Sequence, residues 1–328
     1  MTTRRKFLIA FGAGALGLPL ASLAQQTHAK IPRIGFLGST PEAEVNRTEA
    51  FRQGLRENGW TEHQNVFIEY RWSRGETDRI PELVADLVRL RVDVILAPAS
   101  TYVEPAKRAT STIPIVFANH ADPVGVGHVA SLSRPGGNVT GVTMLLTDVA
   151  VKELELLNEM VPRISRVGIL WNPTTPSHPV AVKATEIAAQ GLKLQLRIEE
   201  ARSVDELDNA FLALSKDRIG GVLVLASPLS FSARAKLAEL TLKYRLPAVF
   251  AYKENAEAGG LASYGADLEA MYRLSATYVD KILRGAKPGD LPVQQPTKFE
   301  LVINRKTAKA LGLTIPRSVL LRADKVIE

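Results

Sequence analysis

Cysteine is absent from this chain of 328 residues. Its absence excludes disulfides, thiolate chemistry and a lipid attachment site behind an export signal. Catalytic motifs are absent too, since no GxSxG, SxxK or GxxxxGK sequence occurs. The histidines form no HExxH pair, so a zinc site would need an unusual ligand set; they are His28, His63, His120, His128 and His178. The sequence therefore indicates no enzyme, no metal site and no cofactor.

Long blocks of one charge are also missing. The formal net charge is +7, and without residues 1–24 there remain 38 basic and 34 acidic residues, a net charge near +4. The basic residues are scattered, so we expect neither nucleic acid nor a membrane surface as a partner. After residue 24 no apolar run has the length of a membrane span.

The first residues carry an export pattern. Two arginines lie in the basic segment Thr3–Leu8, an apolar stretch runs from Phe7 to Ala24, and Ser22–Ala24 supplies the small residues that a signal peptidase reads. Paired arginines followed by Phe-Leu are typical of the twin-arginine pathway. We therefore expect residues 1–24 to be a twin-arginine signal peptide and the protein to be periplasmic.

Two other interpretations of the same stretch are disfavoured. An N-terminal membrane anchor is the alternative, but Gly12, Gly14, Gly17 and Pro19 would make a poor spanning helix. The glycines also match the dinucleotide fingerprint GxGxxG. That motif needs a preceding strand and a following acidic residue at the right distance, and neither is found here.

The strongest positive feature is an internal duplication. Three apolar segments recur in the same order, with offsets of 133, 127 and 133 residues. The pairs are Arg33-Ile-Gly-Phe-Leu-Gly-Ser-Thr40 with Arg166-Val-Gly-Ile-Leu-Trp-Asn-Pro173, Arg91-Val-Asp-Val-Ile-Leu-Ala-Pro-Ala-Ser100 with Arg218-Ile-Gly-Gly-Val-Leu-Val-Leu-Ala-Ser227, and Ile113-Pro-Ile-Val-Phe-Ala-Asn119 with Leu246-Pro-Ala-Val-Phe-Ala-Tyr252. Each apolar run stops at small or polar residues before a helical segment. Two similar lobes with facing loop edges, and a cleft between them, are predicted.

Apolar runs alternate with amphipathic stretches from Ile31 onward, which predicts an α/β fold of two similar Rossmann-like lobes with parallel sheets. We expect an N-terminal lobe of residues 31–143 plus about 267–296 and a C-terminal lobe of 144–266 plus about 297–328. The expected strands are 34–37, 66–72, 92–97, 115–118, 139–143, 167–171, 194–198, 221–226, 248–251, 261–264, 299–303 and 320–323. The expected helices are 42–58, 79–91, 177–190, 203–216, 230–245 and 267–284.

Candidate binding residues follow the ends of these strands, because parallel sheets bind ligands beyond the carboxyl ends of their strands. The candidates are Ser39, Thr40, Ser100, Thr101, Asp122, Asn172, Ser227, Tyr252 and Tyr264. Each has a purely structural alternative. The hydroxyl and amide residues could cap helices, Asp122 could shape the turn before Pro123, and the tyrosines could be ordinary packing. His120 near Asp122 is the one acid–base pairing, and loop neighbours of this kind are more often part of a turn.

Several longer motifs resemble the periplasmic substrate-binding proteins of ABC transporters, in the branch that includes members binding tryptophan and other aromatic amino acids. The motifs are Ile113-Pro-Ile-Val-Phe-Ala with Asp122-Pro123, Arg134-Pro-Gly-Gly-Asn-Val-Thr-Gly141, Glu153-Leu-Glu-Leu-Leu157, Val167-Gly-Ile-Leu-Trp-Asn-Pro173, and the ending Glu300 to Pro316 with Leu320 to Asp324. Together they extend over nearly all of the chain after the signal.

The resemblance implies the periplasmic binding protein type I architecture, with the ligand cleft between the lobes. It implies that the loops of Ser39, Thr40, Ser100, Thr101, Asp122, Asn172 and Ser227 hold the ligand. The expected partners are a small polar or aromatic solute, amino-acid-like solutes included, and an ABC permease in the inner membrane, with the protein acting as a monomer. The loop after residue 225 reads Ala-Ser-Pro-Leu-Ser-Phe, where amino-acid-binding members carry Thr-Asp-Asn, so the solute itself is not identified.

Two other functions remain open at this stage. A sensory receptor of the same fold could report the ligand to a membrane protein instead of a permease. An exported enzyme is the other, because twin-arginine signals often belong to proteins loaded with a cofactor. A transcriptional regulator is disfavoured, since an export signal stands where a DNA-binding helix pair would be.

Overall fold

The computed structural model describes residues 31–328, which form one compact unit. The signal peptide expected at residues 1–24 lies outside the described residues. Among the helices of 31–328, none combines the length and the hydropathy that a bilayer span requires.

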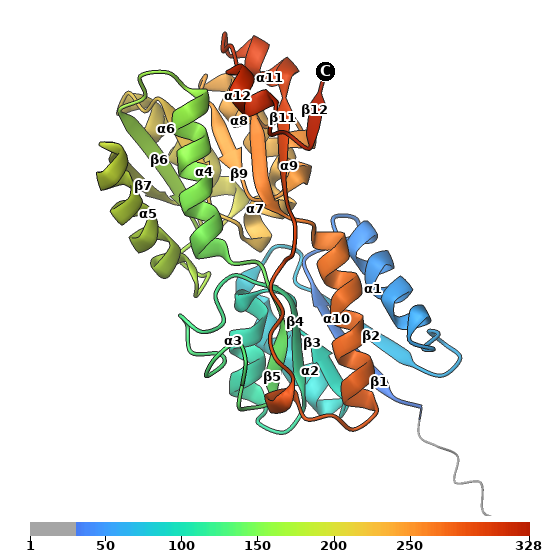
Figure 1. The fold of residues 1–328 in the computed structure, drawn as a ribbon. Coiled ribbons are helices and arrows are strands. Elements are labelled where there is room, and N and C mark those ends of the chain that lie inside the picture. The colour runs from blue at the N-terminus through green and yellow to red at the C-terminus, as the bar shows by residue number, and fades with distance from the viewer. Residues whose placement is uncertain (1–30) are drawn as a thin grey trace, which may run out of the picture. The chain divides into compact units, whose positions relative to one another are not determined.

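Two sheets organise the described chain, and they share one strand order (Figure 1). The first has the order β2-β1-β3-β4-β5 and is entirely parallel; the second has β12-β11-β10-β9-β8-β6-β7, with only β10 and β11 antiparallel. The first sheet comprises β1 (Arg33–Gly38), β2 (Phe67–Trp72), β3 (Val94–Leu96), β4 (Ile115–His120) and β5 (Val139–Thr143). The second comprises β6 (Arg166–Trp171), β7 (Gln195–Glu200), β8 (Gly221–Val224), β9 (Ala248–Phe250), β10 (Ala262–Ala266), β11 (Phe299–Asn304) and β12 (Lys325–Ile327).

The shared order confirms the duplication. Strands β1, β3 and β4 occupy the positions that β6, β8 and β9 occupy in the second sheet, and these are the three repeated segments of the sequence. Even the turns correspond, because Arg91 before β3 and Arg218 before β8 both adopt a positive φ, 52° and 54°. We call each sheet with its helices a lobe.

Helices cover both faces of each sheet. In the first lobe, Phe36 packs with α1 and α10, whereas the next residue, Leu37, packs with α2 and α3. This alternation follows from the period of two along a strand. In the second lobe α4 and α5 cover one face and α6 and α8 the other. The helices are α1 (Val45–Glu57), α2 (Ile80–Arg89), α3 (Ser100–Ala109), α4 (Leu146–Met160), α5 (His178–Leu192), α6 (Leu207–Lys216), α7 (Pro228–Ser232), α8 (Arg234–Lys243), α9 (Lys253–Glu257), α10 (Leu268–Leu283), α11 (Arg305–Ala310) and α12 (Arg317–Leu320).

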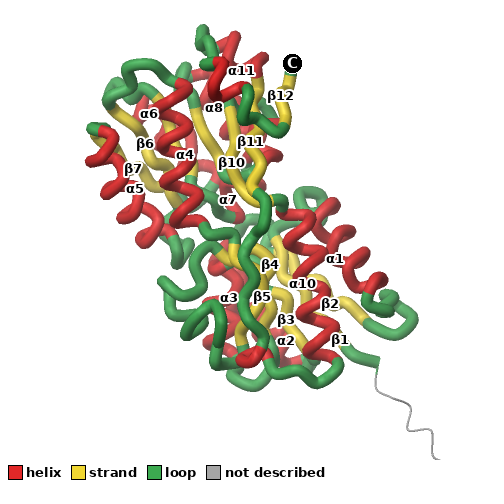
Figure 2. Tube along the Cα trace, in the orientation of Figure 1, coloured by secondary structure: helices red, strands yellow, loops and turns green. Residues whose placement is uncertain are grey.

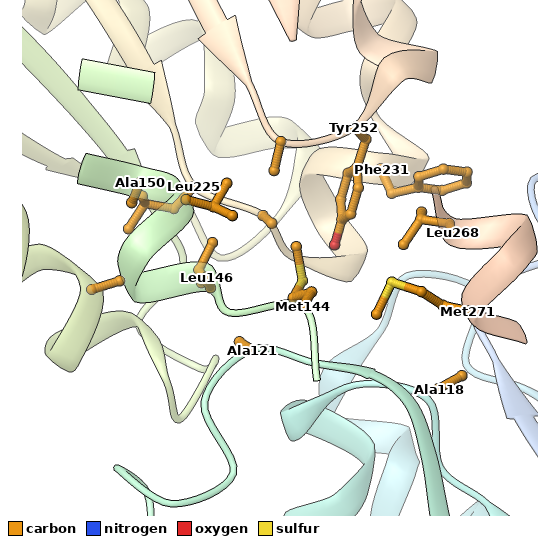
Figure 3. Close-up of a cluster of buried hydrophobic side chains, with 14 of the residues drawn as sticks. Ala118, Ala121, Met144, Leu146, Ala150, Leu225, Phe231, Tyr252, Leu268 and Met271 are labelled. Carbon is orange, nitrogen blue, oxygen red and sulfur yellow. The ribbon is translucent and has the colours of Figure 1, made fainter. Parts of the chain in front are cut away.

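Three connections join the lobes: β5 to α4, β10 to α10, and the segment 291–298 that leads to β11 (Figure 2). The third runs along β5, where the Gln294 amide donates to the Gly141 carbonyl at 3.0 Å and the Thr143 amide donates to the Gln294 carbonyl at 2.9 Å. One apolar cluster continues from lobe to lobe at these connections. It includes Met144 beside β5 and Tyr252 beyond β9 (Figure 3).

Two expected elements were wrong by more than a small shift of their ends. The strand expected at 320–323 is the end of α12 and a turn, and the strand β12 comes later. The Asp324 carboxylate accepts the Leu301 amide at 2.9 Å, and strand pairing with β11 begins at the next residue, Lys325. The helix expected at 230–245 is divided into α7 and α8. Ala233 separates them with a ψ of 15°, outside helical geometry.

Candidate functional site

A small cavity lies where the two lobes meet. Its volume is about 20 Å³, which is room for a single water molecule. The first lobe contributes Ser39, Glu44, Arg47, Pro98, Ala99, Tyr102, Asn119 and Tyr272, and the second lobe contributes Ser227, Pro228, Phe231 and Tyr252. Most of these residues follow the carboxyl ends of β1, β3, β4, β8 and β9, as the fold requires of a ligand site. We call this space the interlobe cavity.

Glu44 and Arg47 bring opposite charges to the interlobe cavity from the start of α1. One carboxylate oxygen of Glu44, Oε1, accepts the Ser39 amide at 2.6 Å and lies 3.7 Å from Nη2 of Arg47. Both side chains are almost fully buried, with 4% and 7% of their surface exposed. The Glu44 backbone itself is not helical, with φ −111° and ψ 12°, so α1 begins at Val45 instead of at residue 42 as expected.

Glycine at position 38 makes room for this arrangement. A Cβ atom there would lie 2.4 Å from the Trp72 ring and 3.0 Å from Oε2 of Glu44. The contact with the ring is closer than a Cβ atom tolerates and the contact with Glu44 is tight, so any other residue at the end of β1 would have to displace Trp72.

Aromatic rings surround the Arg47 guanidinium. Its Cζ lies 3.6 Å from the centroid of the Phe231 ring and 5.4 Å from that of Tyr272. Burial opposes the charge, but Glu44, Glu254 and the neighbouring tyrosines outweigh it and raise the pKa of Arg47. Arg47 is therefore a cation held in a largely apolar setting.

Four buried side chains of the interlobe cavity have a polar atom with no partner among the described residues. These atoms are Oγ of Ser39, Oε2 of Glu44, Nε of Arg47 and Oδ1 of Asn119. Each residue is at most 6% exposed. Buried polar atoms are normally paired, since leaving one unpaired costs about 1–3 kcal/mol. Their convergence on one space is the property expected of a site that binds a polar molecule.

Burial also determines the state of the tyrosines at the interlobe cavity. It raises the pKa of Tyr102 and of Tyr252 far beyond the ordinary range, so both phenols stay neutral. The Tyr102 hydroxyl lies 3.3 Å from Oγ of Ser73. Neutral phenols offer a ring surface and a hydrogen-bonding group without adding charge.

Two smaller spaces, of about 10 Å³ each, adjoin the second-lobe loops. Thr101 and Asn172 line one of them, and Asn172 and Ser227 line the other. The Thr101 hydroxyl is buried without a partner, whereas Oδ1 of Asn172 accepts the amide of Thr174 at 2.9 Å.

His178 ties the two second-lobe loops together. Its Nδ1 accepts the Asn172 amide at 3.0 Å, and its Nε2–H donates to the Ala226 carbonyl at 2.9 Å. Burial lowers the pKa of this imidazole to about 4, although both hydrogen bonds oppose the shift. A neutral, fully buried ring thus positions Asn172 and the residue that precedes Ser227.

The structure brings some of the expected ligand residues together. Ser39, Ser227 and Tyr252 line the interlobe cavity, with Thr101 and Asn172 at the adjoining spaces. Ser227 is also a helix cap, because its Oγ accepts the Ser230 amide at 3.0 Å at the start of α7. The capping role and a place in the cavity therefore coexist at this residue.

Four expected residues lie outside these spaces. The Thr40 hydroxyl accepts the Ala43 amide at 3.1 Å, and Oδ1 of Asp122 accepts the Gly125 amide at 2.8 Å, both as turn residues. The Ser100 hydroxyl is buried without a partner but does not line any of the three spaces. The Tyr264 ring stacks on Phe299 of the neighbouring strand, with centroids 5.8 Å apart.

His120 pairs with His128. Its Nε2 lies 2.7 Å from Nδ1 of His128, whose Nε2 lies 2.6 Å from the Glu104 carboxylate. These three side chains lie in the first lobe and line none of the three spaces described above. They give no acid–base pair with Asp122.

A larger hollow of about 720 Å³ lies at the other end of the second lobe. It is lined by residues between Arg305 and Glu328 only, and its lysines Lys306 and Lys309 are exposed. No repeated loop reaches it and it has no part from the first lobe. The larger volume of this hollow therefore does not make it the candidate site. The interlobe cavity is lined by residues of both lobes and by buried polar atoms without partners in the described part of the chain.

Three residues that line the interlobe cavity were not predicted from the sequence: Glu44, Arg47 and Asn119. Asn119 ends a repeated segment, Ile113–Asn119, but was not singled out. For Arg47 a signal existed: it shares one helix face with the buried Phe51 and Leu55, at spacings of four and eight residues. A cation on the apolar face of a helix is unusual and indicates a function or a specific partner.

Comparison with known proteins agrees with this architecture. A curated tyrosine-binding protein of Clostridioides difficile is 25% identical, over 95% of this chain and 94% of its own. A streptococcal ABC domain solved in complex with L-Trp superposes with a TM-score of 0.83 and 26% identity, covering 90% of this chain and 99% of its own. A conserved domain protein of Vibrio cholerae superposes with a TM-score of 0.84 and 27% identity, covering 90% and 100%. The family model of ABC transporter substrate binding proteins matches residues 41–327, and the chain belongs to that family.

Proposed function

We propose that this protein captures an amino-acid-like solute between its lobes and delivers it to an ABC importer in the inner membrane. One observation carries the proposal: both lobes contribute to a space lined by unpartnered buried polar atoms and by aromatic rings. The relatives named for tyrosine and L-Trp support a solute of this class. Mixed polar and aromatic linings are typical of sites for small molecules.

Capture requires movement, because the interlobe cavity has room for about one water. We propose that residues 31–143 with about 267–296, and 144–266 with about 297–328, part and close as two bodies about the three connections. Contacts from both lobes then favour the closed form when the solute is present. Ser39, Thr101, Asn172, Ser227 and Tyr252 are the proposed contacts; Thr40, Ser100, Asp122 and Tyr264 would contribute only if opening rearranges their loops.

The direct test is to find the solute. Native mass spectrometry of the purified protein is expected to show a bound small molecule, and L-tyrosine or L-tryptophan is expected to raise the melting temperature, since a ligand specific to the folded state stabilises it. Ser39→Ala and Ser227→Ala, one in each lobe, should each weaken binding without unfolding the protein. Normal binding by both variants would contradict the proposed residues.

Delivery needs its own experiment. We propose that residues 1–24 direct the protein to the periplasm, where it meets the permease. Deleting the gene should abolish uptake of the labelled solute at low concentration, and replacing Arg4 and Arg5 by lysine in the restored gene should prevent export. Unchanged uptake in the deletion strain, with solute binding intact in the purified protein, would instead favour the sensory role.

A further inference from the structure

The interlobe cavity holds one full charge of each sign, three residues apart in the chain. Glu44 and Arg47 are its titratable residues of opposite charge, and each is almost completely buried. A ligand with a net charge would leave one of them without compensation in a space closed to water, which is unfavourable. A ligand that is neutral as a whole satisfies both.

The free atoms differ in polarity. Oε2 of Glu44 and Oδ1 of Asn119 can only accept hydrogen bonds, whereas Nε of Arg47 can only donate. The two acceptors therefore need a donor group, and the guanidinium needs an oxygen. The Ser39 hydroxyl, also free, can serve either.

The direction of approach to Arg47 is restricted. Phe231 covers a face of the guanidinium, with Cζ 3.6 Å from the ring centroid. Only the N–H edge is then left for a ligand oxygen, which is the geometry in which guanidinium pairs with carboxylates. The Tyr102, Tyr252 and Tyr272 rings complete the lining with apolar surface.

We infer, on the basis of the proposed solute capture, that the ligand is a zwitterion whose ammonium group is held by Glu44 and Asn119 and whose carboxylate is held by Arg47. Glu44 and Arg47 are thus the residues that select a free amino acid over the corresponding amine or acid. The ammonium group is assigned to the first lobe because Glu44 lines the interlobe cavity, whereas Glu254, the second-lobe acid near Arg47, does not line it.

The experiment compares one amino acid with two derivatives that each lack one charge. The twenty common L-amino acids are screened by thermal shift, and the one with the largest shift is the probe. Its decarboxylated amine and its desamino acid are then titrated by calorimetry. Both derivatives should bind at least roughly 10-fold more weakly than the probe, since each loses a charge-assisted hydrogen bond.

Two variants test which residue holds which charged group of the ligand. Glu44→Gln should weaken the amino acid roughly 10- to 100-fold but leave the desamino acid nearly unchanged, and Arg47→Gln should do the same with the amine as the unaffected ligand. Glu42→Gln and Arg56→Gln are matched controls, because both residues are exposed on the same segment. Circular dichroism and the melting temperature without ligand verify folding, and the isosteric Glu44→Gln variant keeps the test valid if Arg47→Gln unfolds.

Equal weakening of all three ligands by Glu44→Gln, or no weakening of any, would overturn the assignment while solute capture stands. If no amino acid binds but a sugar or another uncharged solute does, the zwitterion is likewise overturned and capture stands. If no solute binds at all, both the zwitterion assignment and the proposed function are wrong.

Discussion

The guanidinium of Arg47 lies over the ring of Phe231, with Cζ 3.6 Å from the ring centroid. Arg47 belongs to α1 of the first lobe and Phe231 to α7 of the second, so this contact spans the two lobes. A cation over an aromatic ring contributes about 2 kcal/mol when both are removed from water. Opening the lobes must break the contact, so it favours the closed form.

Phe231→Leu should therefore weaken solute binding. Leucine retains apolar volume but loses the ring, so the closed form loses about 1–2 kcal/mol and affinity falls roughly 10-fold. Isothermal titration with the amino acid that gives the largest thermal shift measures the effect. Phe67→Leu, at the start of β2, is the control and should bind as the parent does. Equal affinity of the two variants would show that the contact has no part in closure.

The buried ring of His178 predicts a dependence of stability on pH. Its pKa is lowered to about 4 in the folded protein, against 6.5 for the ordinary imidazole, so between these values the unfolded chain binds a proton that the folded chain does not. Stability is complete above about pH 6.5 and falls as the pH drops toward 4, by about 3 kcal/mol from this group.

Urea unfolding between pH 4 and 7 tests this prediction. His178→Gln should unfold at a lower urea concentration at every pH. Its stability should depend much less on pH than that of the parent, because glutamine does not titrate. His63→Gln is the control, since the His63 side chain is 78% exposed. A slope that is the same in the parent and in His178→Gln would assign the pH dependence to other groups.

The buried carboxyl group of Glu153 predicts the opposite dependence, a stability that falls as the pH rises. Burial raises its pKa well above 4.5, and neither carboxyl oxygen has a partner among the described residues. The folded protein therefore holds a proton that the unfolded chain releases above about pH 4.5, so this group destabilises the fold increasingly as pH rises. Glu153→Gln should raise the melting temperature more at pH 8 than at pH 5.

Glu155→Gln, on the same helix but half exposed beside Lys152, provides the comparison. Differential scanning calorimetry at the two pH values measures both variants. A gain for Glu153→Gln that is the same at pH 5 and pH 8 would mean that the carboxyl group does not titrate with the unfolding transition.

Ser227 combines a structural and a proposed binding role, which two variants can separate. Its Oγ caps α7, so Ser227→Ala should cost about 1 kcal/mol of stability, whereas Ser227→Gly should cost only a few tenths. Both variants lack the hydroxyl and should bind the solute equally weakly. Binding by Ser227→Gly at the parent's level would leave the residue with capping as its only role. Calorimetry gives the affinity and urea unfolding the stability.

The sequence predicted the repeated architecture well because strands of a parallel sheet are continuous apolar runs, and a duplicated order of such runs implies a duplicated sheet. The three repeated segments became β1, β3 and β4 and their counterparts β6, β8 and β9. Of the residues in the polar loops that follow them, Ser39, Ser227 and Tyr252 line one space, and their role in binding stays a prediction. The strand predicted at 320–323 was wrong. Leu320-Leu321 is an apolar pair typical of a strand, but the pairing with β11 decides where β12 begins.

The sequence by itself determined the fold class, the duplication and the edge of each sheet where a ligand could bind, because these depend on local periodicity and chain order. Only the tertiary structure decided which side chains occupy that edge. Whether a serine caps a helix or faces a cavity, and whether Arg47 meets solvent or the Phe231 ring of the other lobe, depends on residues far away in the chain. Burial and partnership are properties of the packed molecule, and no local pattern contains them.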